Sequence, residues 1–253
     1  AKAADGRAAV DVLRGLLSEN DRQAAHNRRH FDAHGVLAVN LMSSPGAGKT
    51  RLLEATIDAL SPGVRIGVIE GDLETENDAE RIRAKGVPAV QIATGTACHL
   101  DAHMIHDALH RLDLDQIDLL FIENVGNLVC PASFDLGHHR NVTLLSVTEG
   151  DDKPAKYPVI FRAADRVLLT KTDLLPHLDD FDPARAERHV RDLANPAPVM
   201  LLSVCDSAGL DSWTNWLQSE IESQRGRRDR GESLRPATQP EGTALHAAKD
   251  AGR

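Results

Sequence analysis

The sequence predicts an α/β fold in which helices cover both faces of a mostly parallel β-sheet. Seven short segments are apolar almost throughout, which is typical of strands that are buried on both faces. Helix-like segments lie between them, so we expect successive strand–helix–strand units with right-handed crossovers. The expected strands cover residues 35–42, 64–70, 89–93, 118–123, 141–147, 166–170 and 198–203. The expected helices between and after them cover residues 49–60, 77–85, 99–112, 154–163, 183–194 and 209–222.

The patterning divides the chain into three segments. Apolar residues recur every three to four positions over residues 7–31, so residues 1–32 are expected to form an N-terminal helical extension. The alternation of strands and helices fills residues 33–223, which form the expected main domain. Residues 224–253 are rich in glycine, proline and charge and poor in apolar side chains, which predicts a disordered tail.

The composition narrows the class of protein. Of the 253 residues, 42% are hydrophobic and only 3% are aromatic, so the core can be sizeable but must be aliphatic. The formal net charge of −9 argues against general affinity for nucleic acids or acidic membranes. No apolar run reaches the roughly 18 residues of a transmembrane helix, and we find no signal-peptide pattern. Three cysteines are too few for a disulfide framework, which favours a reducing, cytoplasmic setting.

A phosphate-binding loop follows the first expected strand. The segment "SSPGAGKT" (43–50) matches the P-loop pattern G-x-x-x-x-G-K-[ST], except that Ser43 replaces the leading glycine. Its glycines let backbone N–H groups turn toward phosphate oxygens, and the next helix adds its partial positive charge. Lys49 should reach the β- and γ-phosphates, and the Thr50 hydroxyl should bind Mg²⁺. An ordinary glycine-rich turn is the weaker interpretation, because a strand precedes the segment and a helix follows it. The expected nucleotide-binding residues are Ser44, Pro45, Gly46, Ala47, Gly48, Lys49, Thr50 and Arg51.

Acidic residues follow two other expected strands. Glu123 ends the strand 118–123 and, with Gly126, resembles the Asp-x-x-Gly motif of GTPases with Glu in place of Asp. An acid at the carboxyl end of a parallel strand lies where such sheets bind ligands. Asp72 leaves the strand 64–70 at the same edge and is the candidate for a second acid near Mg²⁺. The expected catalytic and Mg²⁺-binding residues are therefore Lys49, Thr50, Asp72 and Glu123, whereas Glu74, Asp78 and Glu80 are interpreted as solvated charges.

Recognition of a base is predicted near the end of the sheet. The segment "TKTD" follows a strand and resembles the Asn-Lys-x-Asp motif with which GTPases bind guanine, with Thr170 in place of Asn. Lys171 can lie along the base, and Asp173 can accept hydrogen bonds from guanine N1 and its 2-amino group. Ser203 follows the last strand and fits a loop against the base, whereas Val204 departs from the usual alanine. Four residues alone are weak support, but their position after a P-loop favours guanine.

Two cysteines and a histidine are candidates for a metal site. Cys98 and His99 adjoin each other just beyond the strand 89–93, and Cys130 follows the strand that ends in Glu123. Two thiolates with an imidazole suit Zn²⁺ or Ni²⁺. Three ligands make an open site, or one completed by a partner such as a second copy of the chain.

Other interpretations of these residues stay open. A lone cysteine is usually a small buried hydrophobic residue, which is our interpretation of Cys205. A buried thiol ranks second for Cys98, and a catalytic thiol with His99 and Asp101 ranks third, because neighbours in sequence rarely adopt triad geometry. The histidines at 99, 103, 106 and 110 have helical spacing and are expected to share an outward face. We interpret that face as solvated, with weak accessory binding of Ni²⁺ or Zn²⁺ as a testable hypothesis; His26 and His30 carry weaker signals.

Six segments together resemble the HypB family, GTPases that help to insert nickel into [NiFe]-hydrogenase. They run in the family's order over roughly residues 15–220 and are specific as a set, unlike the P-loop alone. The matching segments are "NLMSSPGAGKTRLLE", "EGDLETENDAERI", "TGTACHLDAHM", "ENVGNLVCPASFDLG", "LLSVTEGDDKPAKYP" and "TKTDLLP".

The resemblance implies a P-loop fold of the SIMIBI class, GTP hydrolysis with Mg²⁺ and GTP-promoted homodimerisation. It also implies a nickel or zinc site at Cys98, His99 and Cys130 near the dimer interface. The implied partners are the accessory protein HypA and the hydrogenase large subunit, with no nucleic acid and no membrane. Lys153, in "EGDDKPAKYP", could reach the nucleotide or a partner.

The sequence also departs from the family. No cysteine precedes residue 98, and the long His-rich stretch of some members is missing, so N-terminal nickel storage is absent if residue 1 is the natural start. One alternative function is a related SIMIBI GTPase serving another metalloenzyme such as urease. Another is a metal storage or sensor protein with little nucleotide turnover, which the intact Gly48-Lys49-Thr50 argues against.

Overall fold

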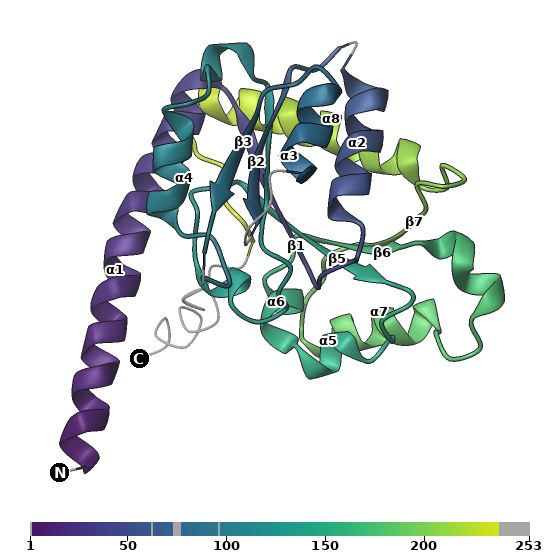
Figure 1. The fold of residues 1–253 in the computed structure, drawn as a ribbon, viewed down its shortest axis with the longest axis horizontal. Helices are drawn as coiled ribbons and strands as arrows, with labels where there is room; N and C mark the ends of the chain where they lie inside the picture. Colours follow the sequence, from purple (N-terminus) through teal and green to yellow (C-terminus); the bar gives the residue numbers. More distant parts are fainter. Residues whose placement is uncertain (1, 62, 73–76, 96, 238–253) are drawn as a thin grey trace.

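A seven-stranded, all-parallel sheet organises the molecule (Figure 1). The computed structural model describes residues 2–61, 63–72, 77–95 and 97–237. The strand order is β3-β2-β4-β1-β5-β6-β7. The strands are β1 (Leu37–Ser43), β2 (Ile66–Asp72), β3 (Ala89–Ala93), β4 (Leu119–Glu123), β5 (Arg140–Ser146), β6 (Arg166–Thr170) and β7 (Val199–Leu202). All seven expected strands are present within two residues of their predicted ends, so the predicted fold class is confirmed.

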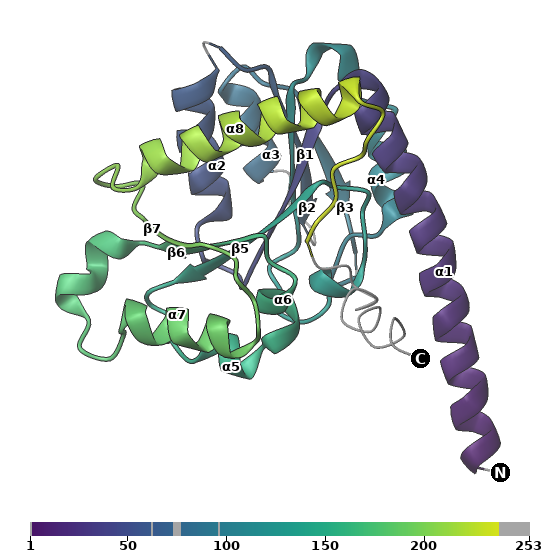
Figure 2. The same ribbon diagram turned by 180° about the vertical axis from the view of Figure 1, so that it is seen from behind.

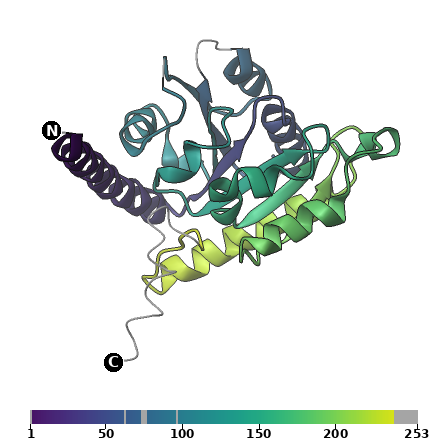
Figure 3. The same ribbon diagram turned by 90° about the horizontal axis from the view of Figure 1, so that it is seen from below.

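Helices cover both faces of the sheet (Figure 3). On one face α2, α3 and α8 pack against the strands, and on the other α1, α4, α6 and α7 do so. Successive strand residues point to opposite faces: Leu41 of β1 joins the first layer of core residues, whereas Met42 joins the second. The helices are α1 (Lys2–His34), α2 (Lys49–Leu60), α3 (Asn77–Ala84), α4 (Ala102–Leu109), α5 (Lys153–Lys156), α6 (Pro158–Arg162), α7 (Pro183–Asp192) and α8 (Leu210–Asp229).

Helix α1 is longer than the predicted 7–31 and has two different halves. Its N-terminal half projects away from the sheet, whereas its C-terminal half lies along the domain (Figures 1 and 2). Phe31 is fully buried in the core, and the Asn27 side chain donates to the carbonyls of Ala102 at 2.8 Å and Leu136 at 3.2 Å. The last turns of the expected extension over 1–32 are therefore part of the main domain.

The expected tail begins inside the folded structure. Helix α8 continues past residue 224 to Asp229, and the segment after it contacts the domain: Arg140 donates to the Arg235 carbonyl at 2.9 Å, and the Ala237 N–H donates to Asp165 at 2.7 Å. Leu234 is 3% exposed in the core, and the Ser233 hydroxyl donates to Asp32 at 2.7 Å. The prediction of disorder is therefore wrong for residues 224–237, because one apolar anchor and a few polar contacts are enough to hold this short segment. Residues 238–253 lie outside the described residues.

Two further helix boundaries differ from the prediction for identifiable reasons. Helix α4 begins at Ala102 instead of 99, because Asp101 caps it by accepting a hydrogen bond from the Met104 N–H at 2.8 Å. The single helix expected over 154–163 is divided at Pro158, which has no N–H and begins the separate helix α6. Among the described residues, no helix combines the length and apolar character needed to cross a lipid bilayer.

Candidate functional site

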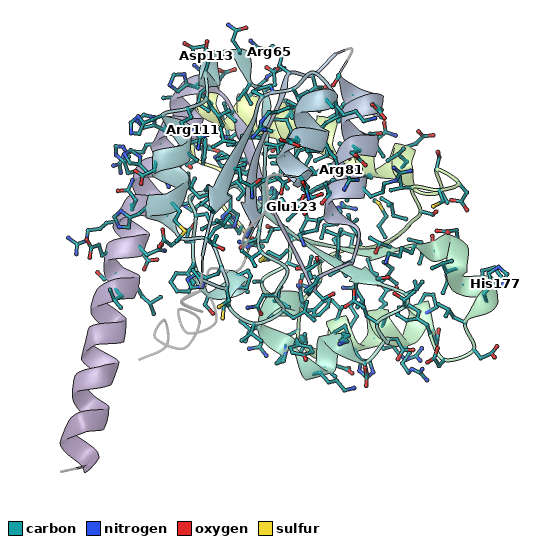
Figure 4. The ribbon with its side chains drawn as sticks, in the orientation of Figure 1. Arg65, Arg81, Arg111, Asp113, Glu123 and His177 are labelled. Carbon is teal, nitrogen blue, oxygen red and sulfur yellow. The ribbon has the colours of Figure 1, made fainter. Side chains whose placement is uncertain are left out.

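The P-loop joins the end of β1 to the start of α2. Gly46 and Gly48 have φ angles of 76° and 97°, which residues with side chains rarely adopt, and α2 begins directly at Lys49. The loop borders a cavity of about 400 Å³ at the carboxyl edge of the sheet. Figure 4 shows Glu123 at this edge, in the middle of the molecule. The expected phosphate-binding loop is thus folded as a loop that can surround an anion.

Lys49, Thr50 and Glu123 meet at the floor of this cavity, as the sequence predicts. The Lys49 ammonium is 3.0 Å from the Ser43 hydroxyl and 4.0 Å from a Glu123 carboxylate oxygen, and its side chain is 7% exposed. The Thr50 hydroxyl donates to Glu123 at 3.1 Å. Burial raises the pKa of Glu123, although the charge of Lys49 acts in the opposite direction. The buried Lys49 and the buried Glu123 therefore lie beside the cavity that the P-loop borders, where they can contact phosphates and a cation.

Glu70 is a functional candidate that the sequence analysis missed. It is paired in register with Glu123 across β2 and β4, and both side chains are buried beside the cavity. Burial, and then the nearby Glu123 carboxylate, raise the pKa of Glu70 far above its usual range. The signal was present in the sequence, because the segments 64–70 and 118–123 both end in glutamate.

Asp78 corrects a second expectation. We interpreted it as a solvated charge, but its carboxylate accepts from the Thr50 hydroxyl at 3.3 Å and from Arg81 at 2.8 Å. Arg81, labelled in Figure 4, also donates to both carboxylate oxygens of Glu54 on α2, at 3.1 and 2.8 Å. These contacts hold α3 over the P-loop. Glu80 is exposed, as expected; Glu74 and the side chain of Asp72, the last residue of β2, lie outside the described part of the chain.

The cavity floor fits Mg²⁺ in its chemistry. It offers a hydroxyl from Thr50 and carboxylates from Glu123, Glu70 and Asp78, and oxygen ligands are those that Mg²⁺ prefers. One oxygen of Glu123 and one of Glu70 are buried without a hydrogen-bond partner. Buried carboxylates in this state are stabilised by a cation, so the donor set favours Mg²⁺ beside Thr50 and Glu123.

A second cavity, of about 280 Å³, lies beside the P-loop and has largely apolar walls. Asp173 lines it, and the buried Ser203 hydroxyl holds the Asp173 carboxylate with a 2.7 Å hydrogen bond. The backbone N–H groups of Cys205 and Asp206 in turn donate to the Ser203 oxygen at 3.2 and 3.4 Å. An oriented carboxylate in an apolar slot suits a base with adjacent N–H donors, as guanine has.

Thr170 and Lys171 link this cavity to the P-loop. The Thr170 hydroxyl donates to the carbonyl of Ala47 at 2.8 Å, and the Lys171 ammonium donates to the carbonyl of Gly46 at 2.7 Å. Lys171 has a φ of 60°, which is unusual for a residue with a side chain and turns it across the loop. Thr170 therefore supplies a bracing contact although it departs from asparagine.

Two other residues at this edge differ from the sequence analysis. Cys205, interpreted as a buried hydrophobic residue, is an exposed free thiol that lines the second cavity, because it lies in the loop after β7 and not in the strand. Glu149 was not singled out, yet its carboxylate accepts hydrogen bonds from Ser44 of the P-loop and from the Ser146 N–H. Lys153, at the start of α5, lies over the ring of Tyr157 at 5.3 Å.

Cys98, His99 and Cys130 lie together although 32 residues separate the cysteines. Their ligand atoms are all within 4.8 Å of one another, and the two sulfur atoms, both of free thiols, are 3.1 Å apart. The hydrogen bond from Cys98 raises the pKa of the Cys130 thiol, and burial lowers the pKa of His99, which keeps the imidazole neutral. The His99 ring stacks on Phe134 with centroids 3.9 Å apart. Two thiols and a neutral imidazole suit a borderline-soft cation such as Ni²⁺ or Zn²⁺.

The loop after β4 connects this group to the P-loop. The Asn127 N–H donates to the Ser43 carbonyl at 2.8 Å, and the Asn127 side chain donates to the Cys98 carbonyl at 3.2 Å. Gly126 approaches the P-loop so closely that a Cβ atom there would lie 2.9 Å from the backbone of Pro45. One short loop therefore touches both sites.

The expected histidine stripe is divided in the structure. His99 precedes α4 and belongs to the cysteine group, because Asp101 caps the helix only after it. Because the Asp101 carboxylate caps α4, it does not orient His99 as a catalytic thiol arrangement would require. His103 is exposed, whereas His106 is half-buried against α1. The solvated-face interpretation thus holds for His103 and for the exposed His110, but is wrong for His99 and His106.

Comparisons with known proteins agree with this architecture. The family model "CobW/HypB/UreG, nucleotide-binding domain" matches residues 37–200. The hydrogenase maturation factor HypB of Azotobacter vinelandii is 55% identical over 213 residues, which cover 84% of this chain and 69% of that protein. HypB of Escherichia coli K12 is 51% identical over 214 residues, or 85% of this chain and 73% of the relative. The crystal structure of HypB from Helicobacter pylori in complex with nickel has a TM-score of 0.78 at 42% identity and covers 81% of this chain and 96% of that one.

The match is broad enough to place the chain in a family. It runs from the first residue of β1 into β7, so it includes the P-loop, the cysteine–histidine group and the loop that joins them. The similarity to the solved HypB structures, with TM-scores of 0.78 and 0.76, extends the agreement to the fold. The chain therefore belongs to the HypB family of hydrogenase maturation factors.

Proposed function

We propose that the chain is a GTP-hydrolysing metallochaperone that binds nickel or zinc and assists nickel insertion into [NiFe]-hydrogenase. The observation that carries the proposal is the position of Asn127, whose backbone holds the P-loop and whose side chain holds the Cys98 segment. Loss of a γ-phosphate can thus be transmitted directly to the metal ligands. The names of the relatives, and the nickel complex of the H. pylori protein, support nickel and hydrogenase.

GTP binding uses both cavities. The P-loop amides hold the phosphates, Lys171 lies along the guanine, and Asp173 accepts from its N1–H and 2-amino group, with Ser203 fixing the carboxylate. A water attacks the γ-phosphorus, the bond to the β–γ bridging oxygen breaks, and GDP and phosphate result. Lys49 stabilises the charge on the transferred group. Thr50, Asp72 and Glu123 would hold Mg²⁺, which when bound supplies further neutralisation of phosphate charge.

The metal is the cargo of the proposed cycle. Cys98, His99 and Cys130 supply three ligands, and the Cys98 thiol is exposed, so an incoming ion has access. The fourth position can be completed by a second copy of the chain across a two-fold axis. Val129, beside Cys130, is apolar and 57% exposed, which supports an interface at this point. We therefore propose a GTP-promoted homodimer with the metal near its interface.

Transfer of the metal needs partners. We propose that HypA delivers or receives nickel at this site and that the hydrogenase large subunit is the final recipient. Hydrolysis changes the contacts of the P-loop, and Asn127 transmits this change to the Cys98 segment. The affinity of the cysteine–histidine group for the ion then falls. Slow turnover is expected when no partner completes the site.

The nucleotide half of the proposal is tested by turnover. Purified chain should hydrolyse GTP but not ATP, and Lys49→Ala should abolish turnover. Asp173→Asn should shift the preference from GTP to XTP, because the xanthine C2 carbonyl accepts the hydrogen bond that the asparagine amide donates. Hydrolysis of ATP at the same rate as GTP, or turnover that survives Lys49→Ala, would contradict the assignment.

The metal half is tested by titration with Ni²⁺ and Zn²⁺, with and without GTP, while oligomer size is followed. Cys98→Ala and Cys130→Ala should each weaken binding at least tenfold, whereas Cys205→Ala should leave it unchanged. Equal binding by Cys98→Ala and the unmodified chain in every nucleotide state would show that the ligands are elsewhere. Nucleotide turnover with metal transfer to a urease but not to a hydrogenase would favour the alternative target.

A further inference from the structure

Helices α1 and α4 lie side by side (Figures 1 and 2), and several imidazoles gather where they pack together. The ring centroids of His26 and His30 on α1 are 5.0 Å apart, and those of His106 and His110 on α4 are 4.8 Å apart. His106 joins the two pairs, because its centroid lies 5.2 Å from that of His26 and 6.4 Å from that of His30. We call these four residues, His26, His30, His106 and His110, the imidazole seam. The ring centroid of His34 lies 6.2 Å from that of His30 on α1, but Asp115 holds the His34 ring at 2.7 Å, so it is set apart from the other four.

The two α4 members already have the separation of metal ligands. Their Nε2 atoms are 3.4 Å apart. Two imidazole nitrogens bound at about 2.1 Å to one tetrahedral ion are themselves about 3.4 Å apart. A spacing of four residues places them one turn apart on the same helix face, and His26 and His30 repeat that spacing on α1. Among the described residues only the α4 pair has this separation, so an ion shared with α1 requires the His26 and His30 rings to turn toward it.

The seam nitrogens are available to a cation. Nε2 of His106 and Nε2 of His110 face each other at 3.4 Å, and Nδ1 of His106, which would carry the proton when Nε2 binds an ion, is buried without a hydrogen-bond partner. Burial, followed by the neighbouring imidazoles, lowers the pKa of both His30 and His106, so these rings are neutral at pH 7 and keep a lone pair. His30 and His110 are exposed, which gives an ion a path from solvent.

The seam differs from the cysteine group in chemistry and in place. It offers nitrogen only, whereas Cys98 and Cys130 offer sulfur. His99, the imidazole of that group, precedes α4 and stacks on Phe134, whereas His106 and His110 lie in the last turn and at the C-cap of α4. The apolar side of α4, with Ile105, packs into the core, so the seam histidines lie on another side of the helix and are not needed for core packing.

We propose that the imidazole seam is a second metal site, which binds one divalent cation of the nickel, copper and zinc group. Neutral imidazole suits all three ions. The bound ion would cross-link α1 to α4 at a point where the two helices already pack together. The site does not depend on GTP hydrolysis or on the cysteine group, so its failure would leave the proposed function intact.

The proposal is tested in the full chain carrying Cys98→Ala and Cys130→Ala, which removes the thiolate site. Titration with Ni²⁺ and with Zn²⁺, in competition with a chromophoric chelator, should show one remaining equivalent of bound metal. His106→Gln with His110→Gln should weaken that binding at least tenfold, and so should His26→Gln with His30→Gln. Cu²⁺ bound to the same background should show nitrogen couplings from several imidazoles in its electron paramagnetic resonance spectrum.

His103→Gln is the matched control, because His103 is exposed on α4 but outside the seam, and it should change the affinity less than twofold. Circular dichroism checks the fold of each variant, and the single change of the exposed His110→Gln replaces the double variant if that one does not fold. Absence of metal binding in the background would overturn the proposal. Unchanged affinity in the α1 double variant, or an equal loss in His103→Gln, would also overturn it.

Discussion

The nucleotide cavity and the cysteine–histidine group lie side by side but are built in different ways. The cavity floor comes from regular elements: Lys49 and Thr50 open α2, and Glu123 and Glu70 end paired strands. The cysteine group instead comes from two loops, which Asn127 and the close approach of Gly126 hold in place. The residues of the cavity floor are therefore anchored in the sheet and its helices, whereas the positions of the candidate metal ligands depend on loops. This difference is what the proposed control of the metal site by the nucleotide requires.

The largest effect is expected from Gly126→Ala, which attacks the contact shared by both regions. The added Cβ would lie 2.9 Å from the Pro45 backbone, so the P-loop and the ligand loop must separate. Overpacking of this kind costs about 1–3 kcal/mol, or about 5- to 150-fold in GTP affinity. Equilibrium binding of a fluorescent GTP analogue measures this loss of affinity. Gly63→Ala, with open space around it, is the control; equal affinities in the two variants would contradict the shared contact.

Asn127→Ala should separate the two regions while leaving the cavity in place. It removes the side-chain bonds to the Cys98 carbonyl and from the Val129 N–H, but keeps the backbone bond to Ser43. We expect about tenfold weaker Ni²⁺ binding, since residues that orient ligands have effects of this size. GTP turnover should change little, and the effect of GTP on metal affinity should disappear. Asn215→Ala, on the exposed side of α8, is the control; a coupling that survives Asn127→Ala would argue for another route.

Glu70→Gln tests whether an ionised Glu70 destabilises the folded protein when no nucleotide or metal is bound. Because burial raises the folded-state pKa of Glu70, the folded protein holds a proton that the unfolded chain releases near pH 4.5. Stability without nucleotide and metal should therefore fall as pH rises above 4.5. Glu70→Gln should reduce this slope, of which Glu123 keeps a part, and melt a few degrees higher at pH 8, with the difference shrinking toward pH 5. Melting temperatures are measured from pH 5 to 8, with Glu80→Gln as the exposed control. If the melting temperatures of Glu70→Gln and the unmodified chain change with pH in parallel, the pKa of Glu70 is not raised in the folded protein.

The smallest effect is expected from Thr170→Ala at the base cavity. It leaves the Ala47 carbonyl without its 2.8 Å partner, at a cost of about 1 kcal/mol and a few-fold loss of GTP affinity. Thr170→Ser keeps the hydroxyl and should bind GTP normally. Metal affinity should be the same in both variants, since neither change touches the loop after β4. Calorimetric titration with GTP and Ni²⁺ compares the two; a loss in the serine variant would mean that the methyl group matters instead.

The sequence predicted most of the residues that line the cavity and the three members of the cysteine–histidine group, but not the Asn127 contacts that connect the two. Strand ends, the P-loop and the acid Glu123 follow from local patterns, because buried parallel strands are apolar throughout and their carboxyl ends meet at one edge. Asp78 and Glu70 were missed or misjudged, because charge in a sequence does not reveal which carboxylate is turned inward. Cys205 was misjudged for a similar reason: its exposure depends on where β7 ends.

The sequence by itself determined the order of strands and helices, the phosphate loop and the types of residue that can hold a base and a metal. These depend on neighbours within a few positions, where hydrophobic periodicity and glycine conformation are decisive. Only the tertiary structure decided that His26 and His30 meet His106, and that Asn127 touches both Ser43 and the Cys98 segment. Such contacts join residues far apart in the chain, and they depend on how helices and loops pack over the finished sheet.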